Sequence, residues 1–372
     1  MRDINKQTVA TGMLKLSVRR VVNLPRMSWV AVVRRGIRTV DVQVGNAVHV
    51  SGSAIVEGAW NGNFEKMGFD DATLFAGSGL KITNAGIVFS PSSHTFDRLH
   101  SVNWGDKLWV SNSLVALLAV SGDTLDPGYL DYESDLMSFI LGLSRMIRSI
   151  PLANGRRLSL HYVNKFTVTD ELNIREYTRP TTPDFESYNE YWKFLCSEFE
   201  SLTSNAKSEN RKVRFQPLAT VSSGYDSPAT AVLAKLCGAT SAVTFSSGRA
   251  NFGPQSDSGA AIARHLDLAV ETFDRLMYRD RADFPEAEFL ATGAGGEDVV
   301  MCAFEEAFIN SCVLTGFLGD TLWERKHPSP WLSKDMQFKY PGGGSLSEFR
   351  LRVGFVHLPV PLMTLRSHES IY

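Results

Sequence analysis

An alternation of short apolar runs with helix-like segments, between residues 215 and 317, constrains the fold of this 372-residue chain more than any other feature. The strand-like runs span 215–221, 241–246, 268–273 and 311–317, and the helix-like segments span 228–236, 256–266 and 297–309. Strands that alternate with helices predict an α/β fold with a doubly wound, mostly parallel sheet. In such sheets, ligands bind at the carboxyl ends of the strands.

The first of these strands runs into a turn of small and polar residues within VSSGYDSPATAVLAKLCG (221–238). Ser227 is a favourable N-cap and Pro228 suits the first helical position, so a helix beginning here presents backbone N–H groups and a positive dipole end. Gly224 allows a positive φ and the close approach of a ligand. With the serine hydroxyls, these groups predict an anion cradle suited to phosphate. Asp226 fits if Mg²⁺ bridges it to phosphate oxygens, and a capped turn without a ligand is the structural alternative.

The turn resembles the PP-loop of the ATP pyrophosphatases, S-G-G-x-D-S, although Ser223 stands in place of the first glycine. These enzymes bind the pyrophosphate end of ATP while a substrate oxygen attacks the α-phosphate. A Walker A loop would end in G-K-[ST], and no lysine occurs in the turn, which disfavours γ-phosphoryl transfer of that type. The resemblance implies an ATP- and pyrophosphate-binding site made by Val221, Ser222, Ser223, Gly224, Tyr225, Asp226 and Ser227.

The neighbouring segments resemble the synthetase half of the asparagine synthetase family. The second strand, AVTFSS, ends where that family holds adenine, which implies Val243 and Phe245 as walls of a base pocket; ordinary core residues are the alternative. VLTGFLGDTLWE (313–324) resembles the family's acidic loop, L-[ST]-G-[DE]-G-[GS]-D-E-[LF]. Its matching positions are Gly316, Gly319 and Asp320, and its departures are Phe317, Leu318 and Thr321. Asp320 is implied as a second Mg²⁺ ligand beside Asp226, with a turn-capping role as the alternative.

The segment ATGAGGEDVV (291–300) precedes this acidic loop. Its paired glycines allow a tight turn, and Glu297 and Asp298 open a predicted helix. The functional hypothesis makes Glu297 a catalytic residue that faces the acyl substrate or its amine. Acidic residues at a helix start are also simple partners of the helix dipole, and that alternative stays open.

The first half of the chain predicts a different architecture. Short runs of β-forming residues separated by Gly, Asn, Asp and Ser predict a sandwich with Trp60, Trp104 and Trp109 in its core. These runs are 29–33, 40–44, 47–56, 86–90 and 107–113, and a helix is predicted at 132–147. The family resemblance, which extends forward to about residue 85, implies a degenerate glutaminase-like domain of the Ntn-hydrolase type.

The domain boundaries follow from these patterns. We expect the β-rich domain at 1–176, a linker and an amphipathic helix at 177–212, and a PP-loop domain of the adenine nucleotide alpha hydrolase type at 213–372, shorter at its C-terminus than a full family member. The helix is predicted because apolar residues recur at helical spacing, at Phe185, Tyr188, Trp192, Leu195, Phe199 and Leu202. The cluster RKVR (211–214) is predicted to be a solvated loop.

Glutamine-dependent members of the family carry a cysteine nucleophile directly after the initiator methionine, with a free amine as its base. Here Arg2 follows Met1 and the first cysteine is Cys196, so we expect no release of ammonia from glutamine. The pattern is similar to β-lactam synthetases and lasso-peptide cyclases, which use the synthetase half for amide-bond formation.

Composition and charge argue against several classes of partner and site. The formal net charge is −2 and the pI about 6.5, so no basic excess points to nucleic acid. No window holds about 18 uninterrupted apolar residues, so we expect no membrane span. The four cysteines are widely spaced, which predicts reduced, mostly buried thiols in a cytoplasmic protein and argues against a disulfide framework or a zinc site. The sequence leaves open whether two copies of the chain form a homodimer.

These observations predict an ATP-dependent, AMP-forming ligase or cyclase that uses ATP and Mg²⁺ to join a carboxylate substrate to an amine. A cationic residue should also stabilise pyrophosphate, and Arg249, Lys326 and Lys334 are available. One alternative is an inert nucleotide-binding or scaffold protein. Another is a different PP-loop reaction, such as thiolation of RNA, which the absent cysteine pairs and near-neutral charge disfavour.

Overall fold

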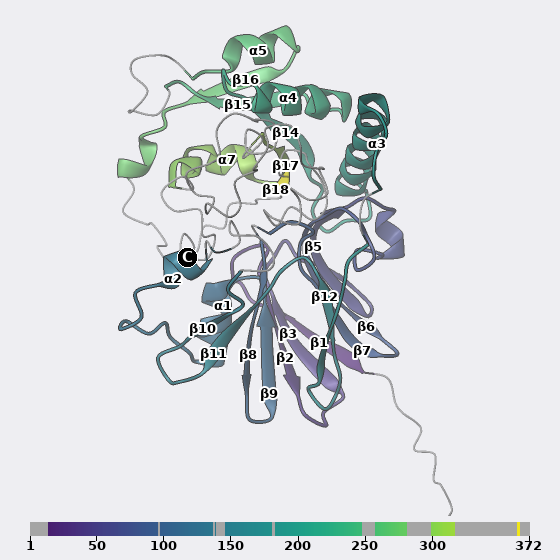
Figure 1. Cartoon of the computed structure of the whole chain (residues 1–372), viewed down its shortest axis with the longest axis vertical. Helices are drawn as coiled ribbons and strands as arrows, with labels where there is room; N and C mark the ends of the chain where they lie inside the picture. The colour runs from purple at the N-terminus through teal and green to yellow at the C-terminus, as the bar shows by residue number, and fades with distance from the viewer. Residues whose placement is uncertain are drawn as a thin grey trace, which may run out of the picture.

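The structure is a computed structural model that describes residues 14–95, 97–136, 138, 146–180, 183–247, 257–280, 299–316 and 363–364. A β-rich part forms the lower half of the view in Figure 1, and a mostly parallel sheet with helices forms the upper half. The mixed α/β architecture agrees with the sequence-based prediction. No helix within the described residues is long and apolar enough to cross a membrane.

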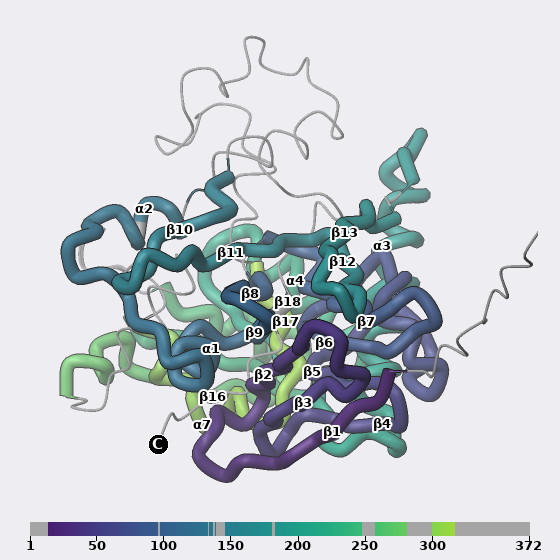
Figure 2. Tube along the Cα trace, turned by 90° about the horizontal axis from the view of Figure 1, so that it is seen from below, coloured from purple at the N-terminus to yellow at the C-terminus, as the bar shows by residue number. Residues whose placement is uncertain are grey.

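The β-rich part consists of two facing sheets, which Figure 2 shows from the end of their strands. The seven-stranded sheet has the order β1-β3-β2-β9-β8-β11-β10, and its strands are β1 (Lys15–Arg20), β3 (Thr39–Val44), β2 (Trp29–Arg34), β9 (Lys107–Ser111), β8 (Leu99–Trp104), β11 (Arg157–His161) and β10 (Ser149–Pro151). The six-stranded sheet has the order β13-β12-β7-β6-β5-β4, with β13 (Ile174–Tyr177), β12 (Lys165–Val168), β7 (Gly86–Ser90), β6 (Phe75–Thr83), β5 (Ala54–Trp60) and β4 (His49–Ser51).

Alternating side chains build the core between these two sheets. In β3, Val40, Val42 and Val44 are buried while the residues between them are more exposed, as a half-buried strand requires. They pack with inward-facing residues of the other sheet, such as Leu80 and Phe89. The far face of the seven-stranded sheet is covered by two helices, α1 (Leu114–Ser121) and α2 (Tyr132–Leu136).

The predicted strands of this half are present, but one of them is divided. The run 47–56 is not one strand, because Gly52 adopts φ +48° and turns the chain between β4 and β5. Trp60 and Trp109 are buried, but they belong to clusters outside the core between the two sheets, and the prediction for Trp104 is wrong because its side chain is exposed. Trp104 lies at the end of β8, where it is 55% exposed and the guanidinium of Arg156 lies 4.8 Å from its ring centroid. Of the predicted helix at 132–147, α2 is the part that the structure describes as helical.

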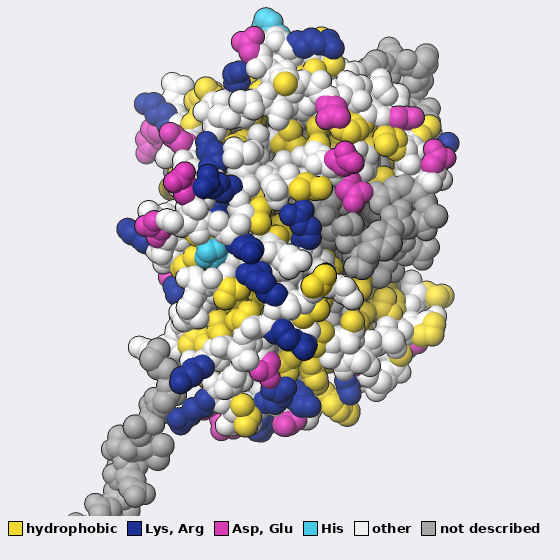
Figure 3. Space-filling view, turned by 180° about the vertical axis from the view of Figure 1, so that it is seen from behind, with side chains coloured by type: hydrophobic (Ala, Val, Ile, Leu, Met, Phe, Trp, Pro, Cys, Tyr) yellow, Lys and Arg dark blue, Asp and Glu magenta, His cyan; other side chains and the backbone are white. Residues whose placement is uncertain are grey.

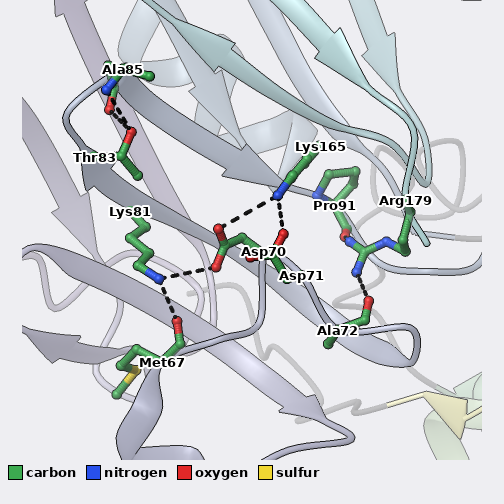
Figure 4. Close-up of polar contacts among 11 residues, drawn as sticks. Met67, Asp70, Asp71, Ala72, Lys81, Thr83, Ala85, Pro91, Lys165 and Arg179 are labelled. Atoms are coloured by element: carbon green, nitrogen blue, oxygen red, sulfur yellow. Dashed lines mark hydrogen bonds and ion pairs between the residues drawn. The ribbon is translucent and has the colours of Figure 1, made fainter.

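Arg179, a buried cation, holds the loops of the six-stranded sheet together (Figure 4). The guanidinium of Arg179, 2% exposed, donates to the carbonyl oxygens of Ala72 (2.5 Å), Pro91 (2.8 Å) and Val163 (3.0 Å). Beside it, Asp70 accepts a hydrogen bond from Lys81 at 3.3 Å. Because each carbonyl belongs to a different loop, Arg179 supplies hydrogen bonds that no regular element provides there.

The second sheet has the strand order β16-β15-β14-β17-β18. Its elements are β14 (Gln216–Thr220), α4 (Asp226–Leu236), β15 (Ser241–Phe245), α5 (Ala260–His265), β16 (Ala269–Phe273), the 3₁₀ turns η4 (Met277–Asp280) and η6 (Val299–Phe304), α7 (Glu305–Phe308), β17 (Ser311–Leu314) and β18 (Met363–Thr364). The first four strands of that order are parallel, and β18 pairs antiparallel with β17.

Helices lie on both faces of this sheet, as the alternation in the sequence predicts. Ala242 of β15 packs toward α4 and α5, whereas its neighbour Val243 packs toward η6 and α7. Figure 1 shows α4 and α5 on one side of the strands and α7 on the other. The predicted helix at 297–309 is described from residue 299 onward. There it begins as the 3₁₀ segment η6 and continues as the short helix α7.

Helix α3 (Tyr188–Ala206) joins the two halves of the molecule. It begins at the N-cap Ser187, and Leu195, Phe199 and Leu202 are buried at the predicted helical spacing. Tyr188 is 69% exposed, so Tyr191 takes the buried position expected for it. The apolar cluster around α3 contains Ala59 and Ala76 of the β-rich half together with Ala219 of β14, so one continuous core spans both halves.

The four cysteines lie within the described residues, and none forms a disulfide. Cys237, Cys302 and Cys312 are buried and Cys196 is half-buried, which confirms the prediction of mostly buried thiols. Burial raises the pKa of Cys312 from its ordinary value of 9.0 to about 12, so this thiol stays protonated at neutral pH.

Arg211 corrects the prediction of a solvated loop at 211–214, because its side chain is buried between the two halves of the molecule. It donates to the side-chain oxygen of Asn205 at 2.9 Å and to the carbonyl oxygen of Gly58. Its guanidinium also lies 4.4 Å from the ring centroid of Phe64 and 5.2 Å from that of Phe215. A basic cluster in a sequence does not reveal that one member will find carbonyls and aromatic rings on another part of the chain.

We predict that Arg211→Ala lowers the free energy of unfolding by roughly 2–4 kcal/mol, because it strands buried acceptors and removes packing. Arg214→Ala is the matched control, since that side chain is 53% exposed and pairs with Glu209 at 3.6 Å, and it should cost less than about 0.5 kcal/mol. Urea unfolding followed by circular dichroism measures both. Equal losses in the two variants would contradict the junction role of Arg211.

Glu57 is a buried carboxyl in the middle of β5. It accepts a hydrogen bond from the hydroxyl of Ser78 at 2.6 Å and one from the amide of Asn112 at 3.4 Å, and Trp29 donates to the same hydroxyl at 2.9 Å. Burial is the main cause that raises the pKa of Glu57 from 4.5 to about 8. The folded protein therefore binds this proton more tightly than the unfolded chain does.

The raised pKa predicts how stability changes with pH. The contribution of Glu57 is fully present below pH 4.5, and it falls as the pH rises toward 8, by an amount on the order of a few kcal/mol. Glu57→Gln cannot ionise, so its thermal midpoint should decline less than that of the wild type between pH 5 and pH 8.5. Glu171→Gln, at an exposed glutamate, serves as the control. Parallel midpoint curves for wild type and Glu57→Gln would refute this expectation.

Candidate functional site

The turn 221–227 lies at the carboxyl end of β14, the central strand of the parallel sheet. Successive strands β14, β15 and β16 are added in one direction, and β17 then lies on the other side of β14. The strand order therefore reverses beside β14. In open α/β sheets, such a reversal leaves a crevice outside the carboxyl ends of the strands, where ligands bind. The sequence predicted the strand end, and the tertiary structure adds the reversal.

The serines of the turn are hydrogen-bonded to one another and to a neighbouring segment. The N–H of Ser222 donates to the hydroxyl of Ser227 at 2.8 Å, and the two hydroxyls lie 2.7 Å apart. Ser223 donates through its backbone N–H to the carbonyl oxygen of Asp257 at 3.0 Å and through its hydroxyl to the carboxylate at 3.1 Å. These hydroxyls and N–H groups are thereby concentrated at the start of α4.

The prediction that Ser227 caps the helix and Pro228 opens it is wrong. Helix α4 begins at Asp226 with Tyr225 at the N-cap, and no side chain caps it. Ser227 lies inside the first turn, and its hydroxyl accepts the N–H of Ser222, which precedes the helix. The hydroxyl is thus used to close the turn. Tyr225 is 95% exposed, so its ring lies at the open side of the site.

Gly224 does not use the positive φ that a glycine allows, because it is not among the glycines with positive φ. A Cβ built there would meet only the hydroxyl oxygen of Ser222, at the ordinary contact distance of 3.5 Å. The described residues would therefore accommodate a Cβ at Gly224 without a clash. No contact with the described protein explains the glycine, whereas a ligand that approaches the backbone would.

Two other glycines are required by close backbone approach. A Cβ on Gly316, just after β17, would lie 2.5 Å from the carbonyl carbon of Asp226 and 2.7 Å from the Cα of Ser227. A Cβ on Gly259 would lie 2.6 Å from the carbonyl carbon of Val221, and the N–H of Gly259 donates to the hydroxyl of Thr244 at 2.9 Å. The turn is therefore held between the exit of β17 on one side and residues 257–259 on the other. This also explains why α5 begins at Ala260 rather than at the predicted 256.

The structure brings the backbone of Asp226 close to Gly316, which follows β17, as the family resemblance implies. The predictions for the other acidic residues of the site stay predictions. Gly319, Asp320 and Glu297 lie outside the described residues, as do the three candidate cations named from the sequence. Within the described ranges there is no group of three or more His, Cys, Asp or Glu that could hold a metal ion. Mg²⁺ bound to nucleotide takes one or two carboxylates, with phosphates and water completing its shell, so metal binding by the half-buried Asp226 stays a prediction.

The candidate base-pocket residues Val243 and Phe245 are 1% and 8% exposed and pack in the core against η6 and α7. The ring of Phe245 stacks with that of Phe304 at a centroid distance of 4.4 Å. The guanidinium carbon of Arg275 lies 4.5 Å from the centroid of the Phe245 ring. In this state the protein itself provides the neighbours of Phe245, and the role in adenine binding stays a prediction.

Sequence reasoning missed Asp257, Gly259 and Arg275. Arg275 follows β16 by two residues, and its side chain pairs with Asp257, Nη2 to Oδ2 at 3.7 Å. The available signal was their position near the carboxyl ends of strands, where polar residues of a parallel sheet gather. The sequence could not show that residues 257–259 cross the turn at 221–223, because that crossing depends on a long-range bridge between Ser222 and Ser258.

The arrangement favours an anion. Backbone N–H groups at the start of α4, serine hydroxyls, the uncrowded Gly224 and the cation Arg275 are combined at one end of the sheet. Asp226 adds one carboxylate, which suits a ligand that brings a metal ion with its phosphates. Comparisons with protein-family models and with curated proteins found no match for this chain.

Alanine substitutions distinguish glycines required by the fold from a glycine available to a ligand. Gly316→Ala forces a methyl group into the backbone of α4, so we expect a loss of roughly 1–3 kcal/mol in the free energy of unfolding. Gly224→Ala meets only ordinary contact, so we expect no loss beyond about 0.5 kcal/mol. Thermal and urea unfolding measure both. A destabilised Gly224→Ala, or a fully stable Gly316→Ala, would contradict the described geometry of the turn.

Proposed function

We propose that the protein is an ATP-dependent, AMP-forming ligase or cyclase that adenylates a substrate carboxylate and forms an amide bond. The second half would be a PP-loop nucleotide-binding domain similar to that of the asparagine synthetase family. The β-rich half would correspond to a degenerate glutaminase-like domain. The substrates are then ATP, a small-molecule or peptide carboxylate and an amine, with Mg²⁺ as the metal.

The observation that carries this proposal is the position of 221–227. The one turn that resembles the PP-loop lies at the carboxyl end of the central strand, beside the reversal of strand order, and Gly316 brings the end of β17 against it. The resemblance was drawn from sequence motifs, whereas the reversal and the close approach are properties of the fold. Their agreement favours nucleotide binding over a turn that is only structural.

The proposed chemistry transfers an adenylyl group. A carboxylate oxygen of the substrate attacks the α-phosphorus of ATP, and the bond from that phosphorus to the pyrophosphate oxygen breaks. The amine then attacks the acyl carbon, AMP leaves, and the amine loses a proton. The contribution of the turn would be to orient the phosphates by N–H and hydroxyl donors, while Mg²⁺ held by Asp226 would neutralise charge on the pyrophosphate.

A second candidate is a nucleotide-binding protein without turnover. The favouring observation is that Ser222 and Ser227 bond to each other and Ser223 bonds to Asp257, so three hydroxyls of the turn already have protein partners. A ligand must exchange these contacts for its own. The two candidates differ in a measurable way, because only the ligase catalyses exchange between pyrophosphate and ATP.

The test is carboxylate-dependent exchange of labelled pyrophosphate into ATP, screened over amino acids, peptides and other carboxylates. We predict that Asp226→Asn weakens Mg·ATP binding by roughly tenfold or more and lowers exchange, because a neutral amide holds Mg²⁺ less well. The thermal midpoint should stay close to that of the wild type. Asp184→Asn, at an exposed position before α3, should behave as the wild type in both measurements.

ATP binding without exchange on any carboxylate would favour the second candidate. Absence of ATP binding by calorimetry in the wild type would overturn both. Unchanged binding and exchange in Asp226→Asn would remove this carboxylate from the metal site and with it the argument from the PP-loop.

A further inference from the structure

Arg275 is a largely buried cation with unused hydrogen-bonding capacity. Its side chain is 15% exposed, and its Nε is buried without a hydrogen-bond partner among the described residues. The contact with Asp257 is long, at 3.7 Å, which is an ion pair beyond hydrogen-bond range. A guanidinium has five N–H donors, and leaving buried donors unsatisfied is costly.

The position of Arg275 is fixed by the fold. It follows β16 at the same edge of the sheet as the turn after β14, and its guanidinium lies over the ring of Phe245 at the end of β15. Stacking on an aromatic ring and the planar shape of the group hold the donors in one orientation. Figure 3 shows Lys and Arg side chains scattered over one face of the molecule among acidic and apolar ones. Arg275 shares the carboxylate of Asp257 with the hydroxyl of Ser223.

Asp257 connects this cation to the turn. One carboxylate oxygen accepts the hydroxyl of Ser223 at 3.1 Å, and the other faces Arg275 Nη2. One anion is therefore shared by a serine of the turn and a guanidinium. Carboxylate and phosphate present paired oxygens to which Arg binds in the same bidentate fashion, so a phosphate group can take the donors that Asp257 engages.

Resting on the proposed function, we propose that Arg275 is the phosphate-binding cation of this site and that Asp257 holds it in place until a nucleotide phosphate replaces the carboxylate. The ligand class is a nucleoside phosphate whose phosphate lies between Ser223 and Arg275. Asp257 then competes with the ligand, so removing its charge weakens its hold on Arg275. Arg275 adds to the candidate cations that the sequence suggested, which lie elsewhere in the chain.

The experiment measures dissociation constants for ATP, AMP and adenosine by calorimetry on the full chain, with and without Mg²⁺. Arg275→Gln should weaken ATP and AMP binding by about tenfold to a hundredfold, because a charge-assisted hydrogen bond is lost, and leave adenosine unchanged. Arg275→Lys should fall between, since it keeps the charge without the fork. Arg264→Gln, at an exposed arginine of α5, is the matched control and should bind all three as the wild type does.

We expect Asp257→Asn to bind AMP several-fold more tightly than the wild type in the absence of Mg²⁺. A merely structural role of Arg275 does not predict this gain. Thermal midpoints of the variants check that each is folded. If the wild type binds ATP and Arg275→Gln binds it equally well, the inference fails while the proposed function stands. If phosphate binding depends on Arg275 but pyrophosphate exchange is absent, the inference stands and the ligase fails. Equal loss of adenosine, ATP and AMP binding in Arg275→Gln would reduce Arg275 to a structural residue and overturn the inference.

Discussion

The parallel pairing of β14 on both of its edges is the constraint on which the site depends. Because β15 and β17 flank the same strand, their carboxyl ends lie beside the turn at 221–227. Backbone approach at Gly259 and Gly316 then fixes the turn from two sides, with no room for a Cβ at either position. A strand-to-helix turn that would be flexible in isolation is held in one geometry by elements distant in sequence.

The two halves of the molecule are joined by burial as well as by the chain. The cluster around α3 includes residues of β5, β6 and β14, and the guanidinium of Arg211 bonds to Gly58 and Asn205 across the same junction. Cationic side chains recur in this structural role, since Arg179 satisfies three loop carbonyls in the β-rich half. Such residues are common in this chain, and their charge alone does not identify a binding surface.

Arg275 differs from those two arginines in what surrounds it. Arg179 and Arg211 donate to carbonyl and side-chain oxygens within hydrogen-bond range, whereas Arg275 is paired at 3.7 Å with a carboxylate that also serves the turn. A buried guanidinium whose anion is shared and distant favours exchange with a better anion. Whether an arginine maintains the fold or can serve a ligand therefore depends on distances that only the tertiary structure supplies.

The sequence by itself determined the succession of strands and helices in the second half, the amphipathic face of α3 and the turn at 221–227, because these follow from local periodicity and from small and polar residues at a strand end. It did not determine the cap of α4, since the hydroxyl of Ser227 bonds to Ser222 outside the helix. Nor did it determine the burial of Arg211, one of whose acceptors, the carbonyl of Gly58, is 153 residues away in the sequence. The placement of Asp257 and Arg275 beside the turn likewise depends on strand order. Hydrophobic pattern specifies which faces are buried, whereas the partners of a polar side chain are set by which distant segments the fold brings within hydrogen-bond range.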